Sequence, residues 1–222
     1  MAIPTDPDLT MNTVIHRALR RDLERLEVAT RGPVPDAQRL ALCRHVTWML
    51  DILHHHHVAE DEGVWPRLVA KRPDAAPLVE QMNAEHHALA EASDAFRAAS
   101  DAWSTDASDD ARQRVHDAVV TMQGATVPHL DHEEREAMPV AVDAFDESDW
   151  AYLNRNYFRK GLSLADNGWS LMWFMDAVGP EHAAVVRSEV PPPVLWLLTR
   201  GFGKRYDREA AVRWGPLAGA RA

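Results

Sequence analysis

Residues 56–66 of this 222-residue chain read HHVAEDEGVWP, and residues 129–139 read HLDHEEREAMP. Both stretches place a histidine four positions before a glutamate, an acidic residue directly after that glutamate, and a large apolar residue followed by proline at the end. A spacing of four residues puts two side chains on one face of a helix, about one turn apart. The repeated pattern therefore predicts two similar helices, each of which presents one imidazole and one carboxylate to a shared interior.

Apolar residues around these two stretches recur at steps of three and four, which is typical of amphipathic helices. Four long segments carry this periodicity, and we expect helices over residues 10–29, 36–70, 75–103 and 106–142. Short connections between long helices favour antiparallel neighbours. The predicted fold class is therefore all-α, an antiparallel up-down-up-down four-helix bundle with an aromatic-rich helical C-terminal extension.

The composition changes after the fourth predicted helix. Residues 9–143 are expected to form the bundle, and the first 143 residues hold 25 acidic and 14 basic side chains. Residues 144–222 hold five of the eight tryptophans and all three tyrosines, with 9 acidic and 10 basic side chains. We expect helices there near residues 148–160, 162–178 and 192–200. The extension should pack on the bundle, although its aromatic density also suits a homodimer interface or a protein partner.

Charge and composition argue against several classes of function. The formal net charge is -10, so phosphate backbones and anionic membrane surfaces should repel the chain. No apolar run reaches the roughly 18 to 20 residues needed to span a bilayer. The N-terminal stretch carries Asp6 and Asp8 where a secretory signal would have basic and apolar residues, and Cys43 is the single cysteine. We expect a cytoplasmic protein that binds neither nucleic acid nor membranes.

Histidines fall on the apolar face of all four predicted helices. His16 lies three residues before Leu19, and His56 lies three residues after Leu53. One histidine of the third helix and one of the fourth occupy the same kind of position, and the glutamates of the repeated stretches follow one turn after theirs. Six side chains should therefore meet in the interior: His16, His56, Glu60, His86, His129 and Glu133.

The choice of residue types indicates which metal such a site would bind. Twelve histidines and one cysteine favour imidazole and carboxylate ligands over thiolate. Four imidazoles and two carboxylates are too many for one structural zinc and suit two ions bridged by the carboxylates. Two irons are the natural occupants, whereas more carboxylates would favour manganese. Without a metal, the same buried groups would need other partners.

Other polar residues near the repeats have simpler interpretations. Four acidic side chains are expected on a solvated face or in hydrogen bonds to the histidines: Asp61, Glu62, Glu134 and Glu136. His45 lies eleven residues before His56, about 16 Å along a helix, and should be a polar group at the other end of the bundle. His116 and His182 are expected at the surface.

The ordered set of motifs resembles the hemerythrin HHE cation-binding domain over about residues 9–143. The matching features are a lone histidine on the first helix, HxxxE with a WP ending on the second, EHxxL at residues 85–89 on the third, and HxxxEE on the fourth. The resemblance implies a non-haem di-iron centre, two Fe ions bridged by oxo or hydroxo groups and by carboxylates. It also implies that the six side chains above are the metal ligands, with Glu60 and Glu133 as the bridges.

One position departs from the resemblance. Oxygen-carrying hemerythrins have HxxxH on the third helix, whereas His86 is followed four residues later by Ala90 and preceded four residues earlier by Met82. The centre then has either an open position or a further ligand from a neighbouring side chain: His57, Asp61, His87 or His132. An open position favours chemistry on a bound oxidant over reversible O2 storage, because a small ligand could coordinate directly.

Relatives of this kind bind O2 or NO, sense oxygen or iron, or decompose peroxide, so the resemblance implies a small diatomic or peroxide ligand. We expect a protein that binds or turns over a small oxidant, H2O2, O2 or NO, with catalase-like or NO-detoxifying activity. One alternative is a sensor of oxygen, iron or redox state, in which the extension relays metal or O2 binding to a partner. The other is a protein that stores O2 or iron.

Overall fold

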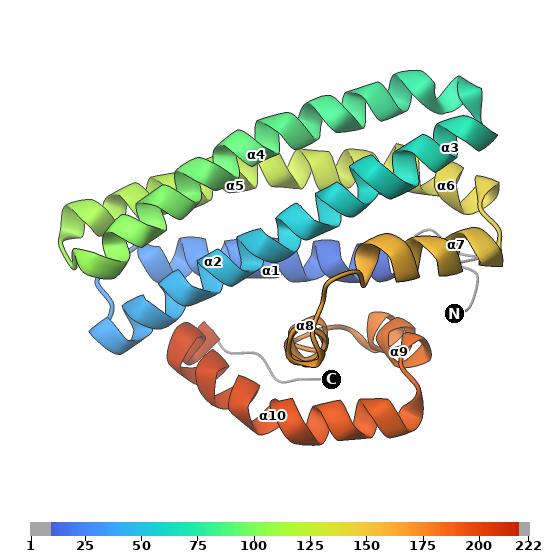
Figure 1. The fold of residues 1–222 in the computed structure, drawn as a ribbon. Helices are drawn as coiled ribbons and strands as arrows, with labels where there is room; N and C mark the ends of the chain where they lie inside the picture. Colours follow the sequence, from blue (N-terminus) through green and yellow to red (C-terminus); the bar gives the residue numbers. More distant parts are fainter. Residues whose placement is uncertain (1–9, 218–222) are drawn as a thin grey trace.

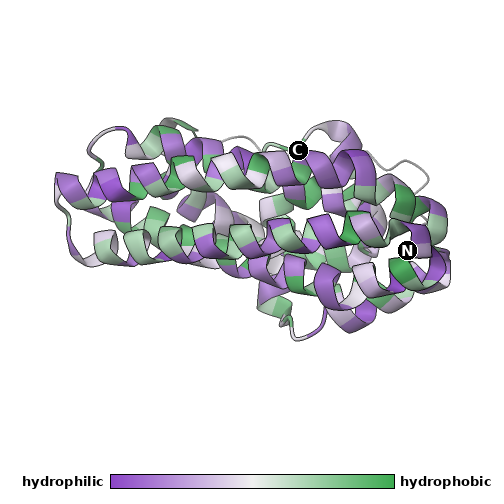
Figure 2. Ribbon diagram, turned by 90° about the horizontal axis from the view of Figure 1, so that it is seen from above, coloured by the Kyte–Doolittle hydropathy of each residue, from purple (hydrophilic) through white to green (hydrophobic). Residues whose placement is uncertain are grey.

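The computed structural model describes residues 10–217, and all regular structure in this part of the chain is helical. Four long helices lie side by side (Figure 1): α1 (Met11–Thr30), α2 (Asp36–Ala59), α4 (Ala76–Thr105) and α5 (Asp109–His132). Helix α5 packs against α1 and α4, and α4 packs against α2. Seen from above, hydrophilic and hydrophobic residues alternate along these helices, as the amphipathic pattern predicts (Figure 2).

Local capping fixes where two of these helices begin. The hydroxyl of Thr10 accepts a hydrogen bond from the backbone N–H of Thr13, and the Thr13 hydroxyl accepts one from the Thr10 backbone N–H. Ser108 caps α5 by accepting from the N–H of Ala111, and two aspartates occupy the first turn of that helix. These contacts satisfy N–H groups that have no partner within a helix and place negative charge at its positive end.

Each repeated stretch contains a wider, π-helical turn that the sequence pattern does not predict. The π turn Glu60–Val64 follows α2, and the π turn Glu133–Ala137 follows α5. Both are closed by a hydrogen bond from the residue five positions later to the glutamate carbonyl. Short helices then continue the path, α3 (Trp65–Lys71) and α6 (Met138–Ala144), with proline near the start of each. Proline is tolerated in the first turn of a helix, because its missing backbone N–H costs least at that position.

The C-terminal part forms four helices rather than the three short ones expected. They are α7 (Glu147–Leu153), α8 (Leu164–Phe174), α9 (Pro180–Glu189) and α10 (Pro192–Trp214), with a π turn at Asn154–Phe158. Helix α9 was not predicted, and α10 continues past its expected end. Helix α10 packs on α2 and on α8, and it lies so close to α8 that a Cβ at Gly168 would be 2.4 Å from the ring of Phe202.

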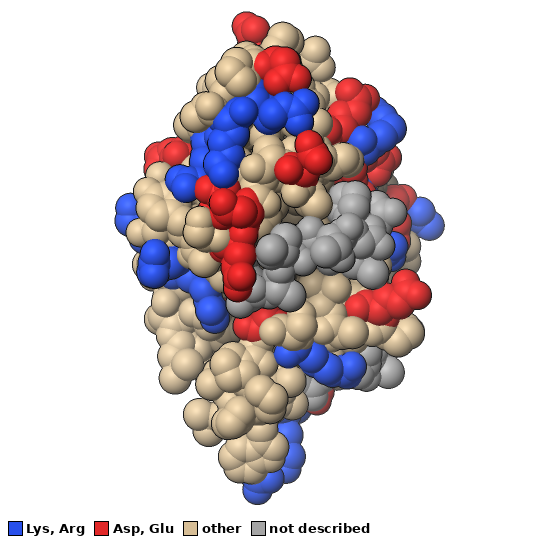
Figure 3. Space-filling view, turned by 90° about the vertical axis from the view of Figure 1, so that its right-hand side faces the viewer, with Lys and Arg blue, Asp and Glu red and all other residues tan. Residues whose placement is uncertain are grey.

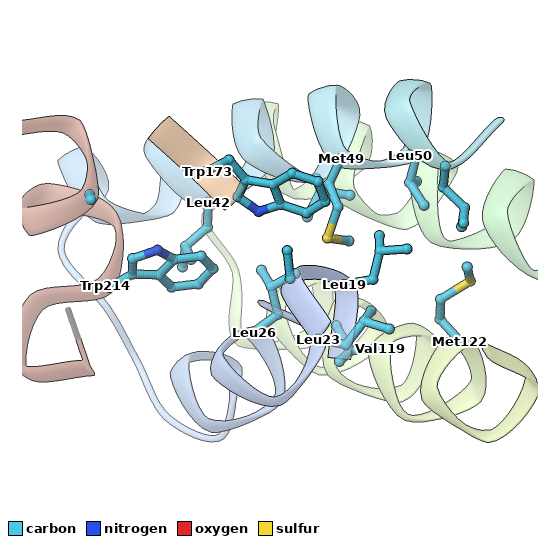
Figure 4. Packing of buried hydrophobic residues seen from close by; sticks show 14 of the residues in the cluster. Leu19, Leu23, Leu26, Leu42, Met49, Leu50, Val119, Met122, Trp173 and Trp214 are labelled. Atoms are coloured by element: carbon cyan, nitrogen blue, oxygen red, sulfur yellow. The ribbon is translucent and has the colours of Figure 1, made fainter. Parts of the chain in front are cut away.

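One apolar core runs from the bundle into the C-terminal helices. Trp173 and Trp214 are fully buried and lie beside Leu26 and Leu42 of the bundle (Figure 4). A second cluster lies beyond the π turns, around Trp65 and other side chains of α3, α6 and α7. The buried polar site described next lies where these two apolar regions meet.

Within residues 10–217, none of the helices combines the length and apolar character that crossing a bilayer requires.

Candidate metal centre

All six side chains that the motifs single out are buried in one place. Each is at most 5% exposed: His16, His56, Glu60, His86, His129 and Glu133. The possible ligand atoms of five of them, all but Glu60, together with those of one further histidine, form two groups in which the atoms lie within 4.8 Å of one another. The His16 group contains His16, His56 and Glu133, and the His57 group contains His57, His86 and His129.

Glu60 reaches both groups. Its Oε1 lies 3.1 Å from Nε2 of His56, in the His16 group, and its Oε2 lies 3.7 Å from Nε2 of His86, in the His57 group. Glu133 also reaches both groups, but through one oxygen. Its Oε2 lies 3.3 Å from Nε2 of His16, in the His16 group, and 3.8 Å from Nε2 of His129, in the His57 group. The two glutamates therefore lie between the groups, as bridging ligands would.

Several of the inward-facing atoms lack a hydrogen bond. Among the described residues, the following buried atoms have no such partner: Oε2 of Glu60, Oε2 of Glu133, and Nε2 of His57, His86 and His129. Buried polar atoms without partners cost free energy and are rare in folded proteins. Their convergence in two groups is explained by bound cations, so the donor set fits a pair of metal ions.

The outward-facing nitrogens, by contrast, have carboxylate partners. Three imidazoles bond through Nδ1: His16 to Glu134 at 2.9 Å, His86 to Asp61 at 2.6 Å and His129 to Glu85 at 2.9 Å. A carboxylate on Nδ1 fixes the orientation of the ring and leaves Nε2 free to bind a metal. Hydrogen bonding of Asp61 and Glu134 to the histidines was among the predicted roles. Glu85 was missed, because its role depends on a neighbour across the α4–α5 contact.

The four candidates for a further ligand have different surroundings. His57 stacks on His86, with ring centroids 4.1 Å apart, and belongs to the second group of ligand atoms. Asp61 is the partner of His86 Nδ1. His87 is exposed and bonds the backbone carbonyl of Asn83. His132 bonds Glu85 at 2.7 Å. Of these four, only His57 joins the ligand atoms of the described residues.

Helix geometry explains how adjacent histidines serve different groups. A step of one residue turns a side chain by about 100° around the helix axis, so His56 and His57 point to different sides of α2. The π turn begins directly after, at Glu60, whose backbone N–H bonds the carbonyls of both histidines. Such widened turns occur often at functional sites.

Burial and mutual charge set the protonation of the site. Burial lowers the pKa of His56 to about 3, and it lowers the pKa values of His57 and His129 as well. These rings are therefore neutral, which is the form that binds metals. Burial and the nearby charge of Glu133 raise the pKa of Glu60 well above its usual range.

The pKa values of Glu133 and His16 shift in the opposite directions to those of Glu60 and His56. Burial acts against ionisation of Glu133, but the charge of His16 outweighs it and holds the pKa of Glu133 well below its usual range. Burial likewise acts against a charge on His16, yet Glu133 and Glu134 raise its pKa. The surroundings thus shift the two carboxyl pKa values in opposite directions, upward for Glu60 and downward for Glu133. A cation between them would remove the conflict.

The remaining histidines lie outside the two groups. His45 is buried away from the centre, and its Nε2 lies 2.7 Å from Oδ2 of Asp22. The prediction that His182 is at the surface is wrong, because it lies in α9, packed against α1, and is 7% exposed. His116 is half-buried and bonds the Thr30 hydroxyl at 3.0 Å.

The centre adjoins a cavity of about 260 Å³ between the bundle and the C-terminal helices. His56 and Glu60 form part of its wall. Asn12 also lines it and donates a hydrogen bond of 2.8 Å to Oε1 of Glu133. Both glutamates are therefore connected to this space, one directly and one through a single side chain.

Comparison with known proteins agrees with this geometry. The model of the hemerythrin HHE cation-binding domain matches residues 13–141, which is more than half of the chain and includes both groups of candidate ligands. No curated protein and no solved structure matches the chain. With its His and Glu side chains converging in two groups, the chain belongs to the hemerythrin HHE cation-binding family.

Proposed function

We propose that this chain is a non-haem di-iron protein, built on an antiparallel four-helix bundle, that binds or turns over a small oxidant such as H2O2, O2 or NO. One observation carries the proposal: two groups of ligand atoms share Glu60 and Glu133 between them. The proposed ligands are the six residues of the two groups, His16, His56, His57, His86, His129 and Glu133, together with Glu60 between them.

Iron suits this donor set better than the alternatives. Five imidazoles and two carboxylates exceed what a single tetrahedral zinc can use, and the absence of thiolates excludes an iron–sulfur cluster at these residues. When bound, two iron ions supply Lewis-acid and one-electron redox chemistry at the centre.

Neighbouring side chains orient the proposed ligands, and burial excludes water from the site. Asp61, Glu85 and Glu134 hold three imidazoles in place through Nδ1. The Asn12 amide occupies Oε1 of Glu133 and so leaves Oε2 directed at the histidines. Near-complete burial excludes bulk water, which strengthens every electrostatic contact inside the site. A small oxidant would approach from the cavity side, where His56 and Glu60 form the wall.

A second candidate function, a sensor, is favoured by a contact between the centre and the C-terminal helices. The ring of Phe158 lies 6.2 Å from that of His56, and His55 Nε2 donates to the Phe158 carbonyl at 2.9 Å. A change at the centre would reach the extension through this contact.

The test is iron content combined with peroxide turnover. Protein expressed with ample iron should contain two irons per chain and release O2 rapidly from H2O2. His129→Ala should lose iron and activity. The matched control is His132→Ala, which removes a histidine of the same helix that also bonds Glu85 and should keep both.

The outcomes separate the candidates. An iron-loaded chain that is silent toward peroxide and does not bind NO contradicts the oxidant proposal. It favours the sensor if iron removal makes the C-terminal helices sensitive to protease. One tightly bound zinc, or no metal at all, contradicts both.

A further inference from the structure

The cavity beside the centre is lined mainly by hydrocarbon. Its walls come from α1 and α2 on one side and from the C-terminal helices on the other. Representative lining residues are Ile15, Ile52, Phe158, Leu171, Val186 and Leu198. At about 260 Å³, the space exceeds the roughly 150 Å³ of an apolar cavity that stays dry and binds benzene. It is therefore large enough for an aromatic ring with a short alkyl chain.

The polar residues that line the cavity differ in how exposed they are to solvent. His56 and Glu60 are each 2% exposed and mark the buried end of the space. Arg159 is exposed and Glu189 half-buried, so these two mark the side nearer to solvent. A further polar group lies in the wall: Ser170 is 6% exposed, and its hydroxyl has no hydrogen-bond partner among residues 10–217.

Exposed apolar side chains also lie on α10, one of the helices that line the cavity. Val194 both lines the cavity and is 41% exposed, and Trp196 and Leu197 of the same helix are 62% and 57% exposed. In the space-filling view from the α3, α6 and α7 end, acidic and basic side chains cover the upper part of the face. The lower part, toward α10, is largely uncharged (Figure 3).

We propose that this cavity binds an apolar organic molecule with a single hydroxyl or hydroperoxyl head, placed with its head toward Glu60 and its hydrocarbon between the bundle and the C-terminal helices. The hydrocarbon part follows from the walls and the volume. The oxygen-bearing head follows from two polar side chains in the wall: Glu60, which is 2% exposed, and Ser170, whose buried hydroxyl has no hydrogen-bond partner among residues 10–217 and is costly to leave unpaired.

This inference deepens the proposed function, and it rests on that function only in placing the ligand head at a wall of the metal centre. It gives the C-terminal extension a role, because α8, α9 and α10 supply one side of the cavity. A bundle without these helices would present Ile15 and Ile52 to solvent and would have no enclosed space for such a ligand. The extension would therefore select which molecules reach Glu60.

Binding can be measured without relying on activity. We expect saturable binding of 4-pentylphenol to the full-length protein by isothermal titration calorimetry. Pentylbenzene, which has the same hydrocarbon without the hydroxyl, should bind at least several-fold more weakly. Val186→Phe fills the cavity from a buried wall position, and Val190→Trp fills it from a half-buried one, which protects the test if the first variant fails to fold.

Both filled variants should bind 4-pentylphenol at least tenfold more weakly. The matched control is Val212→Trp, because Val212 is 48% exposed on α10 and is not among the lining residues; this variant should bind as the unchanged chain does. Absence of saturable binding, or binding that the filled variants leave unchanged, overturns the inference. Equal affinity for pentylbenzene overturns the assignment of the head.

Iron content measured on the same samples separates the two proposals. A chain with two irons that does not bind 4-pentylphenol overturns this inference and leaves the proposed function intact. A chain that binds 4-pentylphenol in the cavity but takes up no iron supports the inference and overturns the proposed function.

Discussion

Two regions of this molecule bury carboxylates among basic groups, and they differ in whether the protein supplies hydrogen bonds to every carboxylate oxygen. At the Asp22 cluster, Oδ2 accepts hydrogen bonds of 2.7 Å from both His45 and Trp173, and Oδ1 accepts one of 2.7 Å from Arg21. Both oxygens of this fully buried aspartate are therefore satisfied by the protein itself. At the metal centre, Glu60 and Glu133 are just as buried, yet each keeps one oxygen without a hydrogen bond among the described residues.

This difference in hydrogen bonding distinguishes the Asp22 cluster, which is structural, from the candidate metal centre. Asp176, in the extension, accepts hydrogen bonds from Arg25 at 2.8 Å and from Tyr206 at 3.1 Å, so the Asp22 region ties the C-terminal helices to α1. His16 and Asp22 are only six residues apart on α1, about 9 Å of helix. Buried charge alone does not identify a metal site, whereas converging atoms without partners do.

The largest expected effect breaks the satisfied cluster. Asp22→Asn removes the charge partner of Arg21 and the hydrogen-bonded anion of a fully buried cluster, and it leaves Arg25 with Asp176 alone, so the free energy of unfolding should fall by about 3–5 kcal/mol in urea titrations. Iron content per folded chain should not change. Asp131→Asn is the control, because Asp131 pairs with Arg20 at the surface and should contribute at most about 1 kcal/mol. A loss of iron with full stability would reverse the roles that we assign.

Acid should weaken the same cluster. Burial, with the positive charge of Arg213, lowers the pKa of His45 to about 4, against about 6.5 in an unfolded chain. Between these values the unfolded chain binds a proton that the folded chain does not, so the free energy of unfolding should fall as the pH drops from 6.5 toward 4. NMR titration of the His45 ring should give a midpoint near pH 4. A midpoint near 6.5 would mean that the ring is not held neutral by its surroundings.

A smaller effect concerns the carboxylates that orient the imidazoles. Asp61→Asn and Glu85→Gln should weaken iron binding about 10- to 100-fold, since each removes the charged partner of an Nδ1. Competition with a chelator measures the affinity. Glu62→Gln serves as the control, because Glu62 is exposed beside the same motif. Equal affinities in all three variants would show that the outer hydrogen bonds do not support the centre.

The smallest effect on stability is expected where the sequence motif is strongest. Glu60→Gln should change the unfolding free energy of the metal-free chain by less than about 1 kcal/mol, because the raised pKa of Glu60 favours its uncharged form and glutamine has the same shape. The same variant should take up fewer than two irons. A stability loss as large as that of Asp22→Asn, with iron retained, would make Glu60 a structural residue.

The metal centre was largely predicted from the sequence, whereas the Asp22 cluster was not. The apolar faces and the two HxxxE stretches predict which six side chains meet, because a four-residue step needs only one regular helical turn. The sequence offers His57 only as one candidate among four, because its position beside His86 depends on the contact between α2 and α4. The π turns were not predicted, because they depend on packing and leave the hydrophobic period almost unchanged.

The C-terminal helices were predicted least well, for identifiable reasons. No helix was predicted between residues 178 and 192, yet Pro180 begins α9 directly after Gly179, because proline in the first turn is compatible with a helix. The last predicted helix ended near residue 200, whereas α10 continues to Trp214 through Gly201 and Gly203 and packs on α2 and α8. The cavity is formed by segments far apart in the chain, so no local pattern indicates it.

The most direct test of the central claim is anomalous diffraction at the iron edge from crystals of the iron-loaded protein. We predict two iron peaks per chain, one beside His16, His56 and Glu133 and the other beside His57, His86 and His129, with Glu60 contacting both. A single peak, a peak that appears only at the zinc edge, or no peak at these side chains would contradict the account.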